Sequence, residues 1–212
     1  LKALPRNIGD PVAKRLTRDA AVGGVTSSSA NILGKNYLKQ VDVIITDWAT
    51  GPELLISTKR MDSSYGKNAP NRVEESYGDA KNLRLRHPLA ALGFVFGLRS
   101  DILHKEPATA EWLFDLLGKL GREDDAYHAT CLVLMDYADT AIAENGEEAP
   151  ATVLPEPGPE AKDEEVVPAP ELDIDDVDRD IASLPTVKIL EEKTPVELSP
   201  GRFLAAMAAR VL

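Results

Sequence analysis

The sequence predicts an α/β fold in which a mixed central sheet is flanked by helices. Short apolar runs, typical of buried strands, alternate with segments that carry the apolar spacing of amphipathic helices. The longest run, LAALGFVFGL over 89–98, is continuous, as expected of a strand covered on both faces. It is only about half as long as a membrane-spanning helix of roughly 20 residues. We therefore expect a cytoplasmic protein without a membrane segment.

The expected elements follow one another along the chain in the order α-β-β-α-β-α-β. Gly66, Asn68 and Pro70 indicate a loop, and Gly121 indicates a helix end. We expect a helix over 11–21, strands over 41–46 and 53–61 joined by a turn at 48–52, a polar loop over 62–71, a helix over 72–86, a strand over 89–98, a helix over 109–120 and a strand over 129–137.

Charge divides the chain into a neutral body and an acidic C-terminal third. Residues 1–143 hold 18 Lys and Arg and 18 Asp and Glu, whereas residues 144–212 hold 6 and 17 and carry the whole net charge of −11. Residues 144–186 are rich in Pro, Ala and acids and contain no aromatic residue. Such a segment buries too little surface to offset its conformational entropy, so we expect a disordered acidic linker. The neutral body can still bind DNA if its basic residues cluster.

An ordered pattern returns over 187–212. Ser199 is a candidate N-cap, and Pro200 suits the first position of a helix. One face of that helix is apolar and needs a partner, which we expect to be the body over 1–143; it holds Phe203, Leu204, Met207 and Val211.

Cysteine and histidine residues give no sign of a metal site. The only cysteine, Cys131, excludes a disulfide within the chain and lies in an apolar run, which indicates a buried structural thiol. The three histidines have no metal-ligand spacing, and we expect structural roles for His87, His104 and His128.

The segment VDVIITDWATGPELLISTKRM over 41–61 carries the residues that suggest chemistry. Asp42 lies in the first strand of a predicted hairpin and Lys59 in the second, where it follows the apolar LLIS, an unusual place for a charge. Paired strands can bring the two side chains together. Cleavage of a phosphodiester requires a divalent metal, an activated water and charge neutralisation. Mg²⁺ prefers oxygen ligands, and a lysine beside it can orient or deprotonate the water.

This segment resembles the PD-(D/E)xK superfamily of nucleases, and the resemblance extends over residues 35–137. Asp42 matches the first acid of the motif and Lys59 its lysine, but Ser57 stands where the superfamily has an acid two residues before the lysine. Some restriction enzymes of this superfamily have the same Ser-x-Lys form and take the missing carboxylate from the following helix. The resemblance therefore implies a restriction-endonuclease-like core, a Mg²⁺ cofactor and a migrated glutamate.

Two glutamates in NRVEESYGD, Glu74 and Glu75, are the candidates for that carboxylate, as catalytic residues and as metal ligands beside Asp42. The spacing from Lys59 favours Glu74. A helix that starts near residue 71 would also place Glu74 in its first turn, where the helix dipole favours an acid. Asp47 and Glu53 flank the hairpin turn and are alternatives, although solvated turn acids are the simpler interpretation.

Basic and amide side chains are dense after Lys59 and suit phosphates and base edges. We expect contacts with double-stranded DNA from Arg60, Lys67, Asn68, Asn71 and Arg72, with an ordinary solvated helix as the competing interpretation. Tyr65 could stack on a base or simply cap the predicted loop.

Two functions are compatible with these features. The first is a Mg²⁺-dependent endonuclease of double-stranded DNA, in restriction or phage defence, possibly a homodimer because a twofold protein matches a twofold site. The second is a catalytically inactive nuclease fold that binds DNA or a protein and carries an acidic regulatory tail. The position of Glu74 and Glu75 relative to Asp42 and Lys59 discriminates between them.

Overall fold

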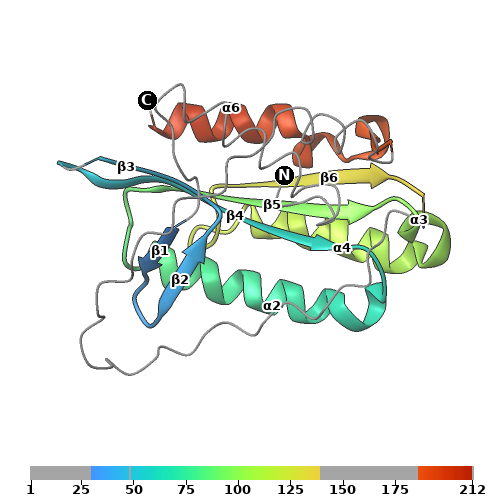
Figure 1. Ribbon diagram of the computed structural model, residues 1–212, viewed down its shortest axis with the longest axis horizontal. Helices are drawn as coiled ribbons and strands as arrows, with labels where there is room; N and C mark the ends of the chain where they lie inside the picture. Colours follow the sequence, from blue (N-terminus) through green and yellow to red (C-terminus); the bar gives the residue numbers. More distant parts are fainter. Residues whose placement is uncertain (1–29, 48, 139–185, 212) are drawn as a thin grey trace, which may run out of the picture.

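The computed structural model describes residues 30–47, 49–138 and 186–211 (Figure 1). The helix predicted over 11–21, Trp48 of the predicted turn, the proposed domain boundary near residue 143 and nearly all of the predicted linker lie outside these residues.

The centre of the fold is a curled mixed sheet of five strands in the order β3-β4-β5-β6-β7. Neighbouring strands are antiparallel for β3–β4, parallel for β4–β5 and β5–β6, and antiparallel for β6–β7. The predicted α/β class is thus confirmed. The strands are β3 (Val43–Asp47), β4 (Gly51–Met61), β5 (Ala91–Arg99), β6 (Ala129–Asp136) and β7 (Lys188–Ile189).

Helices cover both faces of this sheet, with α2 and α4 on one face and α6 on the other (Figure 1). None of the helices in the described part of the chain has the length and apolar composition that a membrane crossing requires. The helices are α2 (Tyr65–Arg84), the short α3 (Ile102–Lys105), α4 (Pro107–Leu120) and α6 (Pro200–Val211), and two 3-10 turns, η2 (Glu191–Lys193) and η3 (Val196–Leu198), precede α6.

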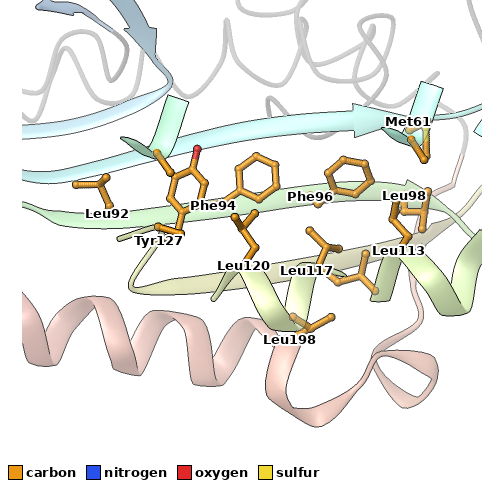
Figure 2. Close-up of a cluster of buried hydrophobic side chains, with 14 of the residues drawn as sticks. Met61, Leu92, Phe94, Phe96, Leu98, Leu113, Leu117, Leu120, Tyr127 and Leu198 are labelled. Atoms are coloured by element: carbon orange, nitrogen blue, oxygen red, sulfur yellow. The ribbon is translucent and has the colours of Figure 1, made fainter. Parts of the chain in front are cut away.

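The apolar run of β5 is buried on both faces, as its continuous pattern predicts. Phe94 and Phe96 point to the main core beneath α2 and α4, and Phe94 stacks on Tyr127 with ring centroids 5.1 Å apart (Figure 2). Ala91 and Val95 instead pack in the smaller cluster under α6. The strand starts two residues later than predicted, since Leu89 is almost fully exposed. The predictions of α4 and β6 are confirmed to within two residues.

A hairpin of β1 (Ala30–Leu33) and β2 (Leu38–Val41) forms a separate two-stranded sheet that was not predicted. The predicted strand over 41–46 is divided, because Val41 ends β2 and Val43 begins β3. Asp42 therefore lies in the bend between two strands, and its placement inside a strand was wrong.

Helix α2 begins at Tyr65, within the residues predicted to form a loop over 62–71. Pro70 lies inside this helix, where it removes one backbone hydrogen bond. Burial explains the difference, because Tyr65 is only 2 % exposed and Ala69 is completely buried on the same side of the helix. Tyr65 is thus a core residue and not a loop residue. Glu74 lies nine residues after the helix start, so its placement in the first turn was also wrong.

A buried polar network fixes the start of α2 at the carboxyl ends of β4, β5 and β6. The Tyr65 hydroxyl lies 2.8 Å from the carbonyl oxygen of Asp62 and also contacts the carboxylate of Asp101. Tyr137 donates to Asp62 Oδ1 at 2.6 Å, and Arg60 Nε lies 2.8 Å from Asp62 Oδ2. Such a network stabilises a unique arrangement when its groups are satisfied, and here it ties three strands to one helix end.

Helix α6 docks on the sheet through two side chains, Phe203 and Met207, which are both buried. The prediction of a four-residue face was half wrong, since Leu204 and Val211 are exposed. Gly93 of β5 makes the close approach possible, because a Cβ there would lie 2.7 Å from Phe203 Cζ and 2.9 Å from Met207 Sδ. The predicted docking of the C-terminal helix is confirmed.

Cys131 and two of the histidines have the structural roles expected of them. Cys131 is buried in the cluster under α6, and burial raises the pKa of its thiol to about 11. His128 accepts a hydrogen bond at Nδ1 from the amide of Leu92, and burial, followed by nearby arginines, lowers its pKa to about 4. His87 Nε2 lies 2.9 Å from the carbonyl oxygen of Leu33, whereas His104 is exposed in α3.

Replacement of Gly93 by valine should loosen α6. The new side chain would overlap Phe203 and Met207, and overpacking costs typically about 1–3 kcal/mol of unfolding free energy, measurable by urea denaturation. The only thiol, Cys131, should react faster with a disulfide reagent, because α6 covers it. Gly201→Ala is the matched control, since a Cβ at that exposed position of α6 meets nothing within 4 Å. Unchanged stability and thiol reactivity in Gly93→Val would contradict this docking.

Candidate active site

Strand β4 extends beyond the end of its pairing with β3. Asp42 accepts hydrogen bonds from the part of β4 that has no partner in β3. The ladder between β3 and β4 ends at the pair Val43 and Ile56. Two residues further on, the amide of Thr58 donates to Asp42 Oδ2 at 2.7 Å, and the Thr58 hydroxyl donates to the same oxygen at 3.0 Å. The carboxylate thus replaces a strand partner. Within the described part of the chain, the other oxygen, Oδ1, accepts no hydrogen bond.

Lys59 is next along β4 and points toward α2. Side chains alternate between the two faces of a strand. Leu55 and Met61 belong to the core beneath α2 and α4, so Lys59 lies on that face as well. Its Nζ is 3.5 Å from Glu75 Oε2, and Arg72 NH1 is 3.1 Å from the same oxygen. The structure therefore brings Lys59 of β4 and Glu75 of α2, two of the candidate catalytic residues, into contact.

The charge of Glu75 is set by its two cationic neighbours. Partial burial alone would raise the pKa of this carboxyl, but Lys59 and Arg72 outweigh burial and hold its pKa below the ordinary value. Only Oε2 is engaged by these cations, and Oε1 has no partner among the described residues. With 49 % of its side chain exposed, Glu75 can be reached from solvent.

Glu74 does not reach Lys59. It is exposed on α2, and adjacent helical residues point about 100° apart. The buried residues of α2 show which side of the helix faces the core; they include Ala69, Ala80 and Leu83. The structure places Glu75, and not the preferred Glu74, at the lysine.

Ser57 occupies a position on β4 that disfavours a charge. Ser57 is only 3 % exposed, and its hydroxyl has no hydrogen-bond partner in the described residues. The buried hydroxyl of Tyr127 interacts with it only loosely and also lacks a hydrogen-bond partner there. A carboxylate at this position would lose its hydration without compensation, which is costly. The more exposed Glu75 can carry a charge at much lower cost.

Three residues near the site were missed by sequence reasoning. Asp79 follows Glu75 by about one helical turn and is buried. It pairs with Lys39 of β2, whose Nζ is 2.5 Å from Asp79 Oδ2, and accepts a hydrogen bond from the Tyr37 hydroxyl at 3.1 Å. These contacts hold the β1–β2 hairpin against α2 and so position Asp42 at the end of β2. The spacing of two acids four residues apart in EESYGD was an available signal.

The alternative acids are used by the β3–β4 turn. Asp47 Oδ1 accepts a hydrogen bond from the amide of Ala49 at 2.7 Å, and Glu53 Oε1 accepts one from the Thr50 hydroxyl at 2.7 Å. Both acids thus have the local role of turn residues, which was the simpler interpretation.

The residues predicted to bind DNA fall into two groups. Lys67 and Asn71 are exposed on α2, and Asn68 is half-buried beside them. Arg72 and Arg60 are engaged within the protein, Arg72 with Glu75 and Arg60 with Asp62. The structure gathers Lys67, Asn68, Asn71 and Arg72 on the helix that carries Glu75, whereas Arg60 belongs to the polar network at the strand ends.

The carboxylate oxygens at this site suit Mg²⁺ better than a metal ion whose ligands must all come from the protein. Across the described residues, no group of three or more His, Cys, Asp or Glu side chains is arranged to hold a metal ion. Mg²⁺ commonly takes only one or two carboxylates and completes its octahedron with water and substrate phosphate. Asp42 Oδ1 and Glu75 Oε1 are the carboxylate oxygens left open at this site. Both are oxygens of the chemical type that Mg²⁺ binds.

Comparison with known protein families, with curated proteins and with solved structures gives no match.

The ion pairs of Glu75 predict its titration. Lys59→Met and Arg72→Met should each raise the pKa of the Glu75 carboxyl, as measured by carboxyl NMR. Because that pKa is lower in the folded than in the unfolded chain, the pairs stabilise the fold above the unfolded pKa, and this contribution is lost as the pH falls through the folded pKa. Glu74→Gln should change the Glu75 pKa far less. An unchanged Glu75 titration in both methionine variants would show that the pairs do not form.

Proposed function

We propose that this protein is a Mg²⁺-dependent endonuclease that hydrolyses phosphodiester bonds of double-stranded DNA and has a restriction-endonuclease-like core. The observation that carries the proposal is the contact between Lys59 and Glu75 at 3.5 Å, together with the hydrogen bond from the amide of Thr58, the neighbour of Lys59 on β4, to the Asp42 carboxylate. A lysine and carboxylates are groups that metal-assisted phosphodiester hydrolysis can use.

Each residue has a distinct role in this proposal. Asp42 and Glu75 would hold Mg²⁺ through their open oxygens. The bound ion would supply Lewis-acid polarisation of the scissile phosphate and lower the pKa of a water. Lys59 donates a hydrogen bond to the attacking water and places its positive charge beside the phosphate. Arg72 holds Glu75 in position and adds a second positive charge, which suits a phosphate oxygen.

The surface of α2 offers a path for the duplex. The helix has 20 residues, which at 1.5 Å per residue makes it about 30 Å long, close to one turn of B-DNA. Lys67 and Asn71 lie exposed on its first half, and Glu75 lies further along. A duplex that follows α2 can therefore contact these side chains while its backbone reaches Lys59.

An incomplete site was expected if neither glutamate could approach Asp42 and Lys59. Glu75 lies 3.5 Å from Lys59, and this contact supports the enzyme over the inactive DNA-binding module. A homodimer that cuts both strands of a twofold site, in restriction or phage defence in the cytoplasm, is the setting we propose for this activity.

Three substitutions should abolish cleavage of plasmid DNA in Mg²⁺. Lys59→Ala, Glu75→Gln and Asp42→Asn should each lower the rate by about 100-fold or more, because positioned proton-transfer and metal-holding groups contribute at least this much. EDTA should stop the wild-type enzyme. Circular dichroism should show that all three variants remain folded.

Glu74→Gln is the matched control, since it changes the same residue type one position away without touching Lys59. It should cut at the wild-type rate. Full activity of Glu75→Gln, or loss of activity in Glu74→Gln, would contradict the assignment of Glu75. Absence of any cleavage by the wild-type protein on duplexes of every sequence would contradict the nuclease itself.

A further inference from the structure

The connection between β1 and β2, residues 34–37 with the sequence GKNY, is held mainly by Asn82 of α2. Asn82 is only 1 % exposed. Its Oδ1 accepts hydrogen bonds from the amides of Asn36 at 2.8 Å and Tyr37 at 3.3 Å, and its Nδ2 donates to the carbonyl oxygen of Tyr37 at 3.0 Å. Its backbone oxygen accepts from the amide of Lys35 at 2.9 Å. One buried side chain and its backbone thus fix three successive residues of this hairpin tip.

The hydrogen bonds between Asn82 and residues 35–37 form a clamp on the tip. Gly34, the first residue of the tip, packs closely against the Asn82 side chain. A Cβ at Gly34 would lie 2.0 Å from Asn82 Nδ2, so no larger residue can occupy the position without a shift. A further bond, from the amide of Gly34 to the carbonyl oxygen of Tyr37 at 3.0 Å, closes the turn. The Tyr37 hydroxyl is bonded to Asp79, which anchors the last residue of the tip as well.

The clamp orders the backbone of the tip, but it does not use the two side chains at the centre of the tip. Lys35 and Asn36 are exposed, and within the described part of the chain their side chains make no hydrogen bond or ion pair. Their backbone amides alone are used by Asn82. Ordering a loop in advance lowers the entropy that is lost when its side chains bind a ligand. Lysine suits phosphate and guanine, and asparagine pairs in a bidentate manner with adenine.

The distance between the hairpin tip and the candidate active site would allow one DNA duplex to contact both. Asp42 follows Tyr37 by five positions, so the chain between them spans at most about 17 Å at roughly 3.3 Å per residue. Half a turn of B-DNA is also about 17 Å. Figure 1 shows the hairpin beside the C-terminal part of α2, the helix that carries Glu75. Because Asp42 is bonded to Thr58, the neighbour of Lys59, a duplex with its backbone at Lys59 could reach the tip within about half a turn.

We propose that the hairpin tip 34–37 is a DNA-reading element, in which Asn36 contacts a base edge and Lys35 a phosphate. This inference rests on the proposed nuclease function and adds the residues that determine its sequence preference.

The test uses 30-base-pair duplexes with a randomised centre, selected for binding in EDTA so that the DNA stays intact. Asn36→Ala should lose the preference at one base-pair position and bind the wild-type-selected duplex about 5- to 100-fold more weakly, the discrimination typical of one bidentate contact. Lys35→Ala should weaken binding to all sequences and lower the slope of log affinity against log salt by about one. Neither change removes a hydrogen bond of the clamp, because only the backbone amides of these residues take part in it.

Lys188→Ala is the control, since Lys188 is exposed on β7 at the opposite edge of the sheet from β3. It should bind and select like the wild type. One outcome is that the wild type binds and cuts DNA while Asn36→Ala and Lys35→Ala select the same sequences with the same affinity as the wild type. That result would contradict the proposed DNA-reading role of the tip and leave the proposed nuclease function intact. If the wild type binds no duplex of the pool and cuts none, both proposals are wrong.

Discussion

The packing of α2 along β4 is the constraint on which the rest of this structure depends. The helix is buried at Tyr65 and Ala69 near its start and at Leu83 near its end, so its rotation about its axis is fixed over its whole length. That rotation decides that Glu75 meets Lys59, and that Asn82 clamps the hairpin tip. Because these contacts lie on one rigid helix, a change in its core packing would disturb the candidate active site and the hairpin together.

Much of the fold could be predicted, because hydrophobic periodicity dominates in α4, β5 and β6. The start of α2 could not, because Gly66, Asn68 and Pro70 are local breaker signals that the burial of Tyr65 outweighs. The β1–β2 hairpin was missed for a related reason, since its four-residue strands are held by tertiary contacts to α2.

The candidate residues could be named from the sequence, but their arrangement could not be predicted. Asp42 and Lys59 could be singled out by the motif, and two adjacent glutamates could be named. The choice between them required the orientation of α2, which its buried residues determine; the preference for Glu74 had rested on its spacing from Lys59 and on an expected helix start near residue 71. Ser57 is buried, so a charge at that position would be desolvated, whereas Glu75 on α2 is accessible.

The most direct measurement is a crystal structure with Mn²⁺ in place of Mg²⁺, in which anomalous scattering locates the ion. The account predicts one ion between Asp42 and Glu75, at about 2.0–2.2 Å from an oxygen of each, with the remaining positions open to water and phosphate. The same peak should be absent from Glu75→Gln and present in Glu74→Gln. An ion bound at Glu74, Glu53 or Asp47, or no ion at saturating Mn²⁺, would contradict the account.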